Sequence, residues 1–209
     1  MSRCVILSAG PRGDINSLRA MLRADDVYIA ADGGWRLAQE LGVTPHILVA
    51  DFDSSDPFAV SEVTEIVRLP VRKDCTDTAA AVDKALELGY RDFLLLGTLG
   101  GRLDHEYAVY QLLVRLAKQG CTTVAADERN RVCALTKSPA AIEPMDGWTL
   151  SLFAFGGDVH DLSIRGAAYE LTDYTLTASD SLCVSNATKG VSCEISFKDG
   201  VLLLFRSKD

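Results

Sequence analysis

Apolar and polar positions follow two different patterns along the chain. The first 126 residues contain six short runs rich in Val, Ile, Leu and Ala, which is typical of buried strands. These runs are Cys4–Ser8, Val27–Ala31, Ile47–Ala50, Glu65–Leu69, Phe93–Leu96 and Thr122–Ala126. The segments 35–41, 78–88 and 107–118 between them repeat apolar residues at helical spacing and end close to a glycine. The alternation predicts a parallel sheet flanked by helices.

The pattern changes after the charged segment Asp127–Arg131. Short runs with strand character follow, and turn signals such as Asp146-Gly147 separate them. The runs are Val132–Leu135, Trp148–Phe155, Val159–Ile164, Tyr174–Leu176, Leu182–Val184, Val191–Phe197 and Val201–Arg206. The last two, joined through Lys198-Asp199-Gly200, predict a closing hairpin. We expect an α/β domain over residues 1–126 and a small all-β domain, a β-sandwich, over residues 127–209.

Composition narrows the class of protein. The chain has 209 residues and a net charge of −8, which argues against a protein that coats nucleic acid, because phosphate neutralisation needs surplus Lys and Arg. No apolar run approaches the roughly 18 residues that cross a bilayer. The six cysteines form no C-x-x-C pair, which favours reduced thiols. We therefore expect a cytoplasmic protein with neither a nucleic-acid nor a membrane partner.

Charged residues and glycines follow each of the first five predicted strands, where an open parallel sheet binds its ligands. The segments are 10–14, 32–34, 51–54, 72–77 and 97–105. Carboxylates gathered there repel one another unless a cation lies among them, and oxygen ligands select a hard ion such as Mg²⁺. Gly100-Gly101 can offer backbone N–H groups to a phosphate, and Lys73 and Arg102 can neutralise its charge. These features predict a nucleoside-triphosphate site, although the G-x-x-x-x-G-K-[ST] motif is absent.

Each of these residues also has a purely structural interpretation. Asp32-Gly33 is typical of a turn, and acids such as Asp77 and Asp104 commonly stand at helix starts, where they complement the backbone N–H groups. Taken alone, Asp77 fits that structural interpretation better, and His105 fits a helix start better than a catalytic base. The functional hypothesis depends on five separate segments agreeing.

The motifs of these segments resemble those of the thiamine pyrophosphokinase family. The matching motifs are Ala31–Gly34, Asp51–Ser54, Lys73–Asp77 and Leu99–His105, and the later segment Leu182–Asn186 matches more loosely. The resemblance covers nearly the whole chain. It implies Mg²⁺-dependent transfer of a pyrophosphoryl group from ATP to the hydroxyethyl oxygen of thiamine, with release of AMP. It also implies a homodimer whose active site lies between the α/β domain of one subunit and the β domain of the other.

The resemblance further implies roles for individual residues. Asp51, Asp53 and Asp77 would hold the metal and, with Arg102, carry catalysis. The nucleotide-binding residues would be Asp32, Gly33, Gly34, Lys73, Asp74, Thr76, Gly100, Gly101, Arg102 and Asp104. Thiamine would contact Asp77, Tyr169, Ser185 and Asn186. The chain departs from the family pattern at Ala50, often a glycine, and at Trp35, often a small residue, and the sequence assigns neither a role.

Two other functions are compatible with the sequence. One is a Mg²⁺-dependent kinase or phosphohydrolase that acts on another small alcohol, which would release ADP or free phosphate instead of AMP. The other is a non-catalytic sensor of thiamine or nucleotide, which would bind thiamine without turnover. The full acidic set argues against a sensor, because a protein that only binds gains nothing from holding so many repelling carboxylates.

Overall fold

The structure is a computed structural model that describes residues 2–50, 65–68 and 75–209. The chain divides into two compact units. The first contains the residues up to Leu112 together with Gly120–Glu128, and the second contains Leu113–Gln119 together with Arg129–Asp209. The division along the chain therefore falls two residues later than the expected one, and the end of one helix is grouped with the second unit.

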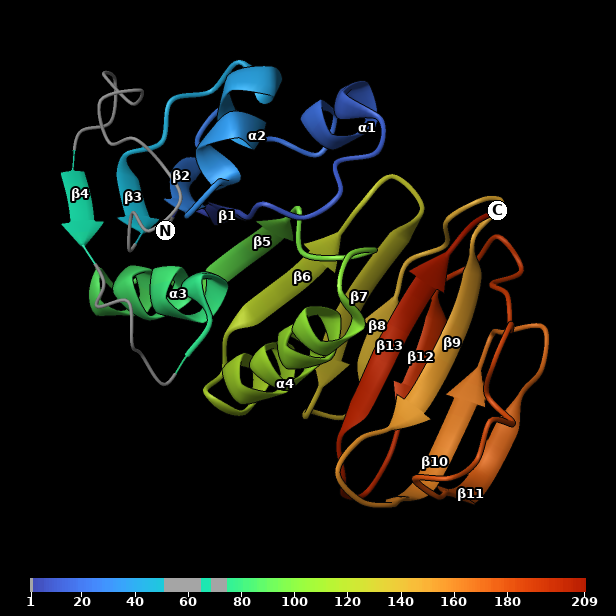
Figure 1. The fold of residues 1–209 in the computed structure, drawn as a ribbon. Helices are drawn as coiled ribbons and strands as arrows, with labels where there is room; N and C mark the ends of the chain where they lie inside the picture. The colour runs from blue at the N-terminus through green and yellow to red at the C-terminus, as the bar shows by residue number, and fades with distance from the viewer. Residues whose placement is uncertain (1, 51–64, 69–74) are drawn as a thin grey trace. The chain divides into compact units, whose positions relative to one another are not determined.

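The first unit is built on a parallel sheet (Figure 1). Its strands, in their order across the sheet, are β4 (Glu65–Arg68), β3 (Ile47–Ala50), β2 (Val27–Ala31), β1 (Cys4–Leu7), β5 (Asp92–Leu96) and β6 (Thr122–Ala126). Each neighbouring pair is parallel. Every residue of β1 and β3 is buried, because side chains on both faces of these strands are covered. The predicted strands are confirmed.

Four helices belong to this part of the fold: α1 (Ile15–Arg19), α2 (Gly34–Leu41), α3 (Asp77–Glu87) and α4 (Leu103–Lys118). Leu18 of α1 and Leu37 of α2 pack with Val5 and Leu7 of β1, whereas α3 lies on the other face of the sheet (Figure 1). The sequence did not predict α1, because five residues are too few to show a period. None of the helices in the described ranges is both long and apolar enough to span a membrane.

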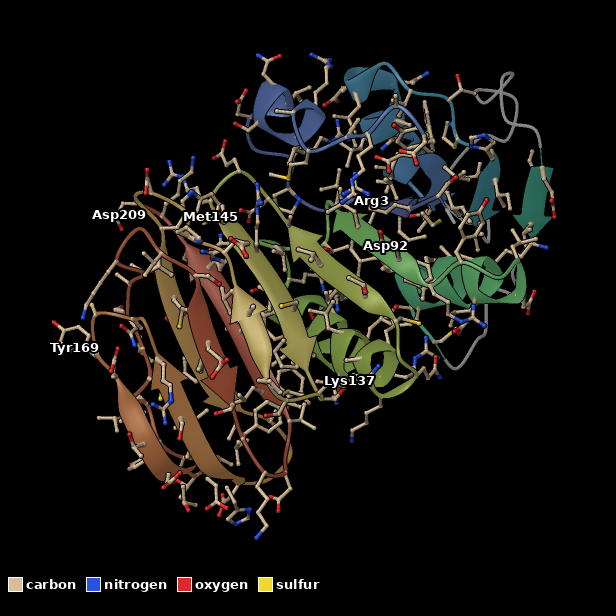
Figure 2. All side chains as sticks on the ribbon, turned by 180° about the vertical axis from the view of Figure 1, so that it is seen from behind. Arg3, Asp92, Lys137, Met145, Tyr169 and Asp209 are labelled. Atoms are coloured by element: carbon tan, nitrogen blue, oxygen red, sulfur yellow. The ribbon has the colours of Figure 1, made fainter. Side chains whose placement is uncertain are left out.

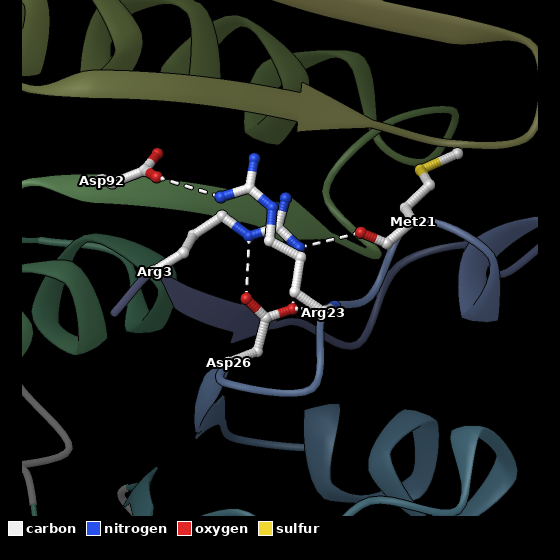
Figure 3. Close-up of polar contacts among 5 residues, drawn as sticks. All are labelled: Arg3, Met21, Arg23, Asp26 and Asp92. Carbon is white, nitrogen blue, oxygen red and sulfur yellow. Dashed lines mark hydrogen bonds and ion pairs between the residues drawn. The ribbon is translucent and has the colours of Figure 1, made fainter. Parts of the chain in front are cut away.

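An ion pair lies at the amino edge of the parallel sheet (Figure 3). Asp26 precedes β2 and accepts hydrogen bonds from Nε and Nη2 of Arg3, which precedes β1, at 2.9 and 2.7 Å. Asp26 Oδ2 also accepts the backbone N–H of Arg23 at 2.7 Å, and Arg3 Nη2 donates to the carbonyl of Met21 at 2.8 Å. Both buried charged groups are therefore hydrogen-bonded, as stability requires.

The second unit contains two layers of antiparallel strands that enclose one apolar core, as the predicted sandwich requires. In one layer the neighbouring strands are, in order, β7 (Asn130–Leu135), β13 (Leu202–Ser207) and β9 (Thr149–Ala154). The other has the order β11 (Leu171–Leu176), β10 (Val159–Arg165), β12 (Cys193–Ser196) and β8 (Ala140–Ile142). Leu152 and Leu204 of the first sheet share the core with Ile164 and Ile195 of the second.

Three details of the second unit differ from the sequence prediction. Strand β8 was not predicted. The closing hairpin is wrong, because β12 pairs with β10 and β8, whereas β13 pairs with β7 and β9 in the other sheet. The connection between them crosses the sandwich, and it is held where Lys198 N–H donates to the carbonyl of His160 at 3.0 Å. Leu182–Val184 forms turns instead of a strand, although the carbonyl of Cys183 accepts the N–H of Leu152.

Candidate active site

A cavity of about 350 Å³ lies at the carboxyl edge of the parallel sheet. Residues that follow β1, β2 and β5 line it, together with the first turns of α3 and α4. Five residues predicted for the site are among them: Asp32, Thr76, Asp77, Gly101 and Arg102. The structure therefore gathers acids and a cation from separate segments in one place, as the sheet topology allows.

Asp32 is the most constrained of these residues. Its φ of 46° lies in the left-handed region, which costs free energy for a residue with a Cβ. Its N–H donates to the carbonyl of Val49 at 2.8 Å, which ties the turn to the end of β3. Its Oδ1 is buried and has no hydrogen-bond partner in the part of the chain that the structure describes. A buried carboxylate oxygen without a partner is costly, which is the condition expected of a ligand-binding group.

Thr76 and Asp77 begin helix α3. Thr76 is the N-cap, and its hydroxyl accepts the N–H of Ala79 at 3.2 Å. Asp77 lies in the first turn, where its charge complements the helix dipole. Because Thr76 caps the helix, the structure does not need Asp77 as the capping residue. The carboxylate of Asp77 belongs to a residue that lines the cavity, which favours the functional interpretation over the structural one.

Arg102 and Asp104 form an exposed bidentate ion pair beside the cavity. Arg102 Nε and Nη2 donate to the two carboxylate oxygens of Asp104 at 3.1 and 2.7 Å. The hydrogen bond raises the pKa of Arg102 and lowers the pKa of Asp104. Only Arg102 of the pair lines the cavity, so Asp104 is placed to orient it. His105 also lines the cavity from the first turn of α4.

The predicted glycines divide into two groups. Gly101 lines the cavity, whereas Gly33, Gly34 and Gly100 do not. At Gly34 a Cβ would lie 1.9 Å from the carbonyl oxygen of Leu7, so the packing of α2 on β1 requires glycine there. The N–H of Gly100 donates to Glu106 Oε2 at 2.9 Å. The two glycines that the sequence placed together at a phosphate are therefore used differently.

Several cavity residues were not predicted as site residues. Ser8 Oγ and Thr78 Oγ1 lie 2.9 Å apart and share a hydrogen bond, and Thr98 Oγ1 is buried with no partner among the described residues. A Cβ on Gly10 would lie 2.4 Å from the carbonyl oxygen of Gly97. Because glycine has no Cβ, the segments that follow β1 and β5 can approach each other closely. A small or polar residue within three positions of the end of a buried strand is the signal that could have identified Ser8, Gly10 and Thr98.

Four predicted site residues, Asp51, Asp53, Lys73 and Asp74, lie outside the described residues. Within the described ranges, no three His, Cys, Asp or Glu side chains are grouped closely enough to hold a metal ion. Asp32 and Asp77 nevertheless supply carboxylates to the cavity lining, next to hydroxyl groups. Oxygen donors of this kind, with an unpaired buried oxygen on Asp32, fit a hard divalent cation.

The structure gives Trp35 and Ala50 a packing role. Trp35 of α2 packs against Ala30, Leu48 and Ala50 on strands β2 and β3. Ala50 is buried, and its methyl group belongs to the surface that the indole covers. The large side chain on the helix therefore lies over a sheet surface in which two of the three contacted residues are alanines, a complementary shape that allows close packing.

The predicted thiamine-binding residues of the second unit lie in one place. Tyr169 is 72% exposed, and its side chain is directed away from the unit (Figure 2). The buried Asn186 accepts the N–H of Tyr169 at 2.9 Å and donates to its carbonyl at 2.7 Å. The N–H of the exposed Ser185 donates to Ser151 Oγ at 3.0 Å. Asn186 thus holds the backbone of Tyr169, while Tyr169 and Ser185 offer the exposed side chains.

Comparison with known families assigns both units. Residues 18–125 match "Thiamin pyrophosphokinase, catalytic domain", and residues 140–202 match "Thiamin pyrophosphokinase, vitamin B1 binding domain". The chain is 27% identical over 209 residues to thiamine pyrophosphokinase of Bacillus subtilis (strain 168), with 98% of each chain covered. It is 24% identical over 216 residues to thiamin pyrophosphokinase 1 of Caenorhabditis elegans, with 98% of this chain and 88% of that protein covered.

Solved structures agree with this assignment. The crystal structure of thiamine pyrophosphokinase from Bacillus subtilis matches with a TM-score of 0.89 at 27% identity, over 100% of both chains. The thiamin pyrophosphokinase from Geobacillus thermodenitrificans matches with a TM-score of 0.86 at 26% identity, over 100% of this chain and 98% of that one. Most of the residues that line the cavity, from Ala31 to Val109, lie within the region that matches the catalytic domain, and Tyr169 lies within the region that matches the vitamin B1 binding domain. The chain therefore belongs to the thiamine pyrophosphokinase family.

Proposed function

We propose that the protein transfers a pyrophosphoryl group from ATP to the hydroxyethyl oxygen of thiamine, producing thiamine diphosphate and AMP. The cavity at the carboxyl edge of the sheet is the observation that carries this proposal. It brings Asp32, Asp77 and Arg102 together from three segments. These three residues lie in the region that matches the catalytic domain, while a second region matches the vitamin B1 binding domain.

The reaction needs positioning more than acid–base chemistry. The thiamine oxygen attacks the β-phosphorus of ATP, and a new oxygen–phosphorus bond replaces the bond to the oxygen that leaves with AMP. Charge on the transferring group grows on its non-bridging oxygens, which Arg102 at the cavity is placed to stabilise. A loose transition state needs little help from a base, so one of the carboxylates accepts the alcohol proton only as the bond forms.

We propose that Mg²⁺ is held by Asp51, Asp53 and Asp77. Asp77 supports this proposal from the described part of the chain, because it lines the cavity together with Asp32. When bound, the ion neutralises charge on the phosphate oxygens of ATP. Asp32, Thr76, Gly101 and Arg102, which line the cavity, are proposed to contact the nucleotide together with Lys73 and Asp74. Gly33, Gly34, Gly100 and Asp104, which do not line it, are proposed to support these contacts. Removal of divalent ions with a chelator is expected to abolish turnover, and Mg²⁺ is expected to restore it.

We propose that the second unit binds thiamine and that the protein is a homodimer with its active site between subunits. Tyr169 offers an exposed ring to the thiamine, and Ser185 and Asn186 stand beside it. Both units expose large apolar side chains, which an interface would cover. In the first unit they include Leu103 and Tyr107, and in the second Tyr169, Leu182, Val184 and Val191. Light scattering tests the dimer, and a monomer at assay concentrations would contradict it.

We also propose that the protein works in the cytoplasm, where thiols stay reduced. All six cysteines are free, and Cys4, Cys121, Cys183 and Cys193 are buried. Burial raises the pKa of Cys133 and of Cys183 to about 11, so both stay protonated and unreactive at neutral pH. Fractionation of cells that express the protein at its natural level tests this location.

The product of the reaction distinguishes the proposed function from its alternatives. Incubation with ATP, Mg²⁺ and thiamine, followed by separation of the nucleotides, is expected to give AMP and thiamine diphosphate in equal amounts. ADP or free phosphate would instead indicate a kinase or phosphohydrolase. Thiamine binding in a calorimeter without any turnover would indicate a sensor.

Asp77→Ala is the variant that tests the site itself. We expect it to abolish turnover, while the loss of one first-turn acid lowers the melting temperature by no more than about 4 °C. Glu87→Ala removes an exposed carboxylate from the other end of the same helix and is the matched control. Near-normal activity of Asp77→Ala would remove Asp77 from the site.

A further inference from the structure

The start of helix α4 carries a carboxylate whose two oxygens are both hydrogen-bonded. Glu106 lies in the first turn of α4. Its Oε2 accepts the backbone N–H of Gly100 at 2.9 Å, and its Oε1 accepts the hydroxyl of Tyr110, one helical turn further on. Hydrogen bonds to both oxygens fix the rotamer of the side chain. The Glu106 carboxylate therefore links Tyr110 of helix α4 to the backbone of Gly100, which precedes the helix.

Tyr110 keeps this arrangement intact at neutral pH. Burial, with the hydrogen bond to Glu106 as the next contribution, raises the pKa of Tyr110 above its ordinary value. The phenol therefore stays protonated and can donate its hydrogen bond at neutral pH. A hydrogen bond between a charged carboxylate and a backbone N–H is stronger than one between neutral groups.

The backbone N–H groups of residues 100–102 fall into two groups as a result. Gly100 has a φ of 75° and gives its N–H to Glu106. Gly101 and Arg102 line the cavity, and within the described ranges their N–H groups have no acceptor. Donors at the start of a helix of 16 residues suit a phosphate oxygen. The hydrogen bond between Gly100 and Glu106 thus fixes the turn on the side away from the cavity. The N–H groups of Gly101 and Arg102 stay available to a ligand in the cavity.

We propose that Glu106 is a positioning residue that holds the Gly100–Arg102 turn in the conformation that binds the phosphates of ATP. This proposal rests on the proposed function, because it assigns the phosphate groups of the donor to this turn. Glu106 itself does not line the cavity, so it acts through Gly100 and not through contact with the substrate. It adds a determinant that lies outside the four motifs of the sequence resemblance.

The test compares three variants of the full chain. Glu106→Ala removes the acceptor and is expected to raise the KM for ATP about tenfold while leaving the KM for thiamine within about twofold. Glu106→Gln keeps an oxygen acceptor and is expected to recover the KM for ATP to within about threefold of the wild type. Gln111→Ala, an exposed position on the same helix, is the control and is expected to match the wild type.

Hydrogen exchange gives a readout that does not depend on catalysis. The Gly100 amide is expected to exchange about tenfold faster in Glu106→Ala than in the wild type, and Glu106→Gln to restore most of its protection. Equal effects on the KM values for ATP and thiamine, or an unchanged KM for ATP with faster exchange, would show a purely structural role and overturn the proposal. If the wild type made no AMP, the proposed function would fail, whereas exchange would still report on the Gly100–Glu106 bond.

Discussion

Strand β2 begins after one aspartate and ends before another, and the two carboxylates differ in whether the protein supplies hydrogen bonds to them. Asp26, at the amino edge of the sheet, is buried, and both its oxygens accept hydrogen bonds from Arg3. Asp32, at the carboxyl edge, has a left-handed backbone and a buried oxygen without a partner in the described part of the chain. The same residue type at the two ends of one strand therefore has its oxygens hydrogen-bonded at one edge of the sheet and keeps an unpaired buried oxygen at the other.

The comparison shows that the amino edge of the sheet stabilises the fold, whereas the carboxyl edge carries the candidate active site. At the amino edge, Arg3 and the backbone N–H of Arg23 donate hydrogen bonds to the carboxylate of Asp26, so this acid is already paired within the protein (Figure 3). At the carboxyl edge the cavity keeps polar atoms of Asp32 and Thr98 unpaired. Unpaired groups cost stability in the free protein, and a ligand that pairs them recovers that cost on binding.

Asp26→Ala is expected to have the largest effect. It leaves the guanidinium of Arg3 buried without its partner, which costs about 3–5 kcal/mol of unfolding free energy. Urea denaturation followed by circular dichroism measures it. Asp92→Ala removes a more exposed and longer pair, to Arg23 at 3.4 Å, and is expected to cost less than about 1 kcal/mol. Equal losses for the two variants would contradict the distinction between buried and exposed acids at this edge.

Asp32→Asn tests the other end of the strand. Asparagine keeps the shape and tolerates a left-handed backbone, but it removes the charge. We expect kcat/KM for ATP to fall about 100-fold, which corresponds to about 2.7 kcal/mol. We expect the unfolding free energy to stay within about 1 kcal/mol of the wild type, because no partner within the protein is lost. A large loss of stability with full activity would show that Asp32 belongs with Asp26, as a structural acid.

Much of the fold could be predicted because its signals are local. Strands buried on both faces, such as β1 and β3, appear as continuous apolar runs, and α3 shows both its N-cap Thr76 and its apolar stripe. The closing hairpin was wrong because a connection such as Lys198–Gly200 has the same composition whether it turns within one sheet or crosses to the other. Only the pairing of β12 with β10 decides between the two.

The sequence could predict only those site residues whose position follows from where a strand or helix begins or ends. Asp32, Asp77 and Arg102 follow or precede elements whose order fixes the edge at which they meet. Thr98 and Glu106 were not predicted as site residues, because their roles depend on contacts between segments that the sequence does not place. The glycines show the same limit, since a glycine required by packing and one beside a ligand are the same residue in a sequence.

Gly34→Ala separates those two roles. A Cβ there would lie 1.9 Å from the carbonyl oxygen of Leu7, so α2 or β1 must shift, and we expect a loss of about 1–3 kcal/mol in unfolding free energy. Gly157→Ala is the control, because nothing lies within 4 Å of its added Cβ, and we expect almost no change. If Gly34→Ala kept full stability but lost ATP binding, Gly34 would be a ligand contact and not a packing residue.

The smallest expected effect is a pH dependence of the unfolding free energy, caused by Cys4 beside Asp26 at the amino edge of the sheet. Burial, with the negative charge of Asp26 as a second contribution, raises the pKa of Cys4 from 9.0 to about 12. Above pH 9 the unfolded chain loses this proton while the folded protein keeps it, so stability is complete below pH 9 and falls as the pH rises towards 12. The loss due to Cys4 is expected to be about 1.4 kcal/mol at pH 10. Comparison with Cys4→Ala isolates it, because Cys133 and Cys183 titrate in both proteins. The difference in unfolding free energy between wild type and variant is expected to shrink between pH 8 and pH 10, and a constant difference would show that the Cys4 thiol ionises equally in the folded and unfolded states.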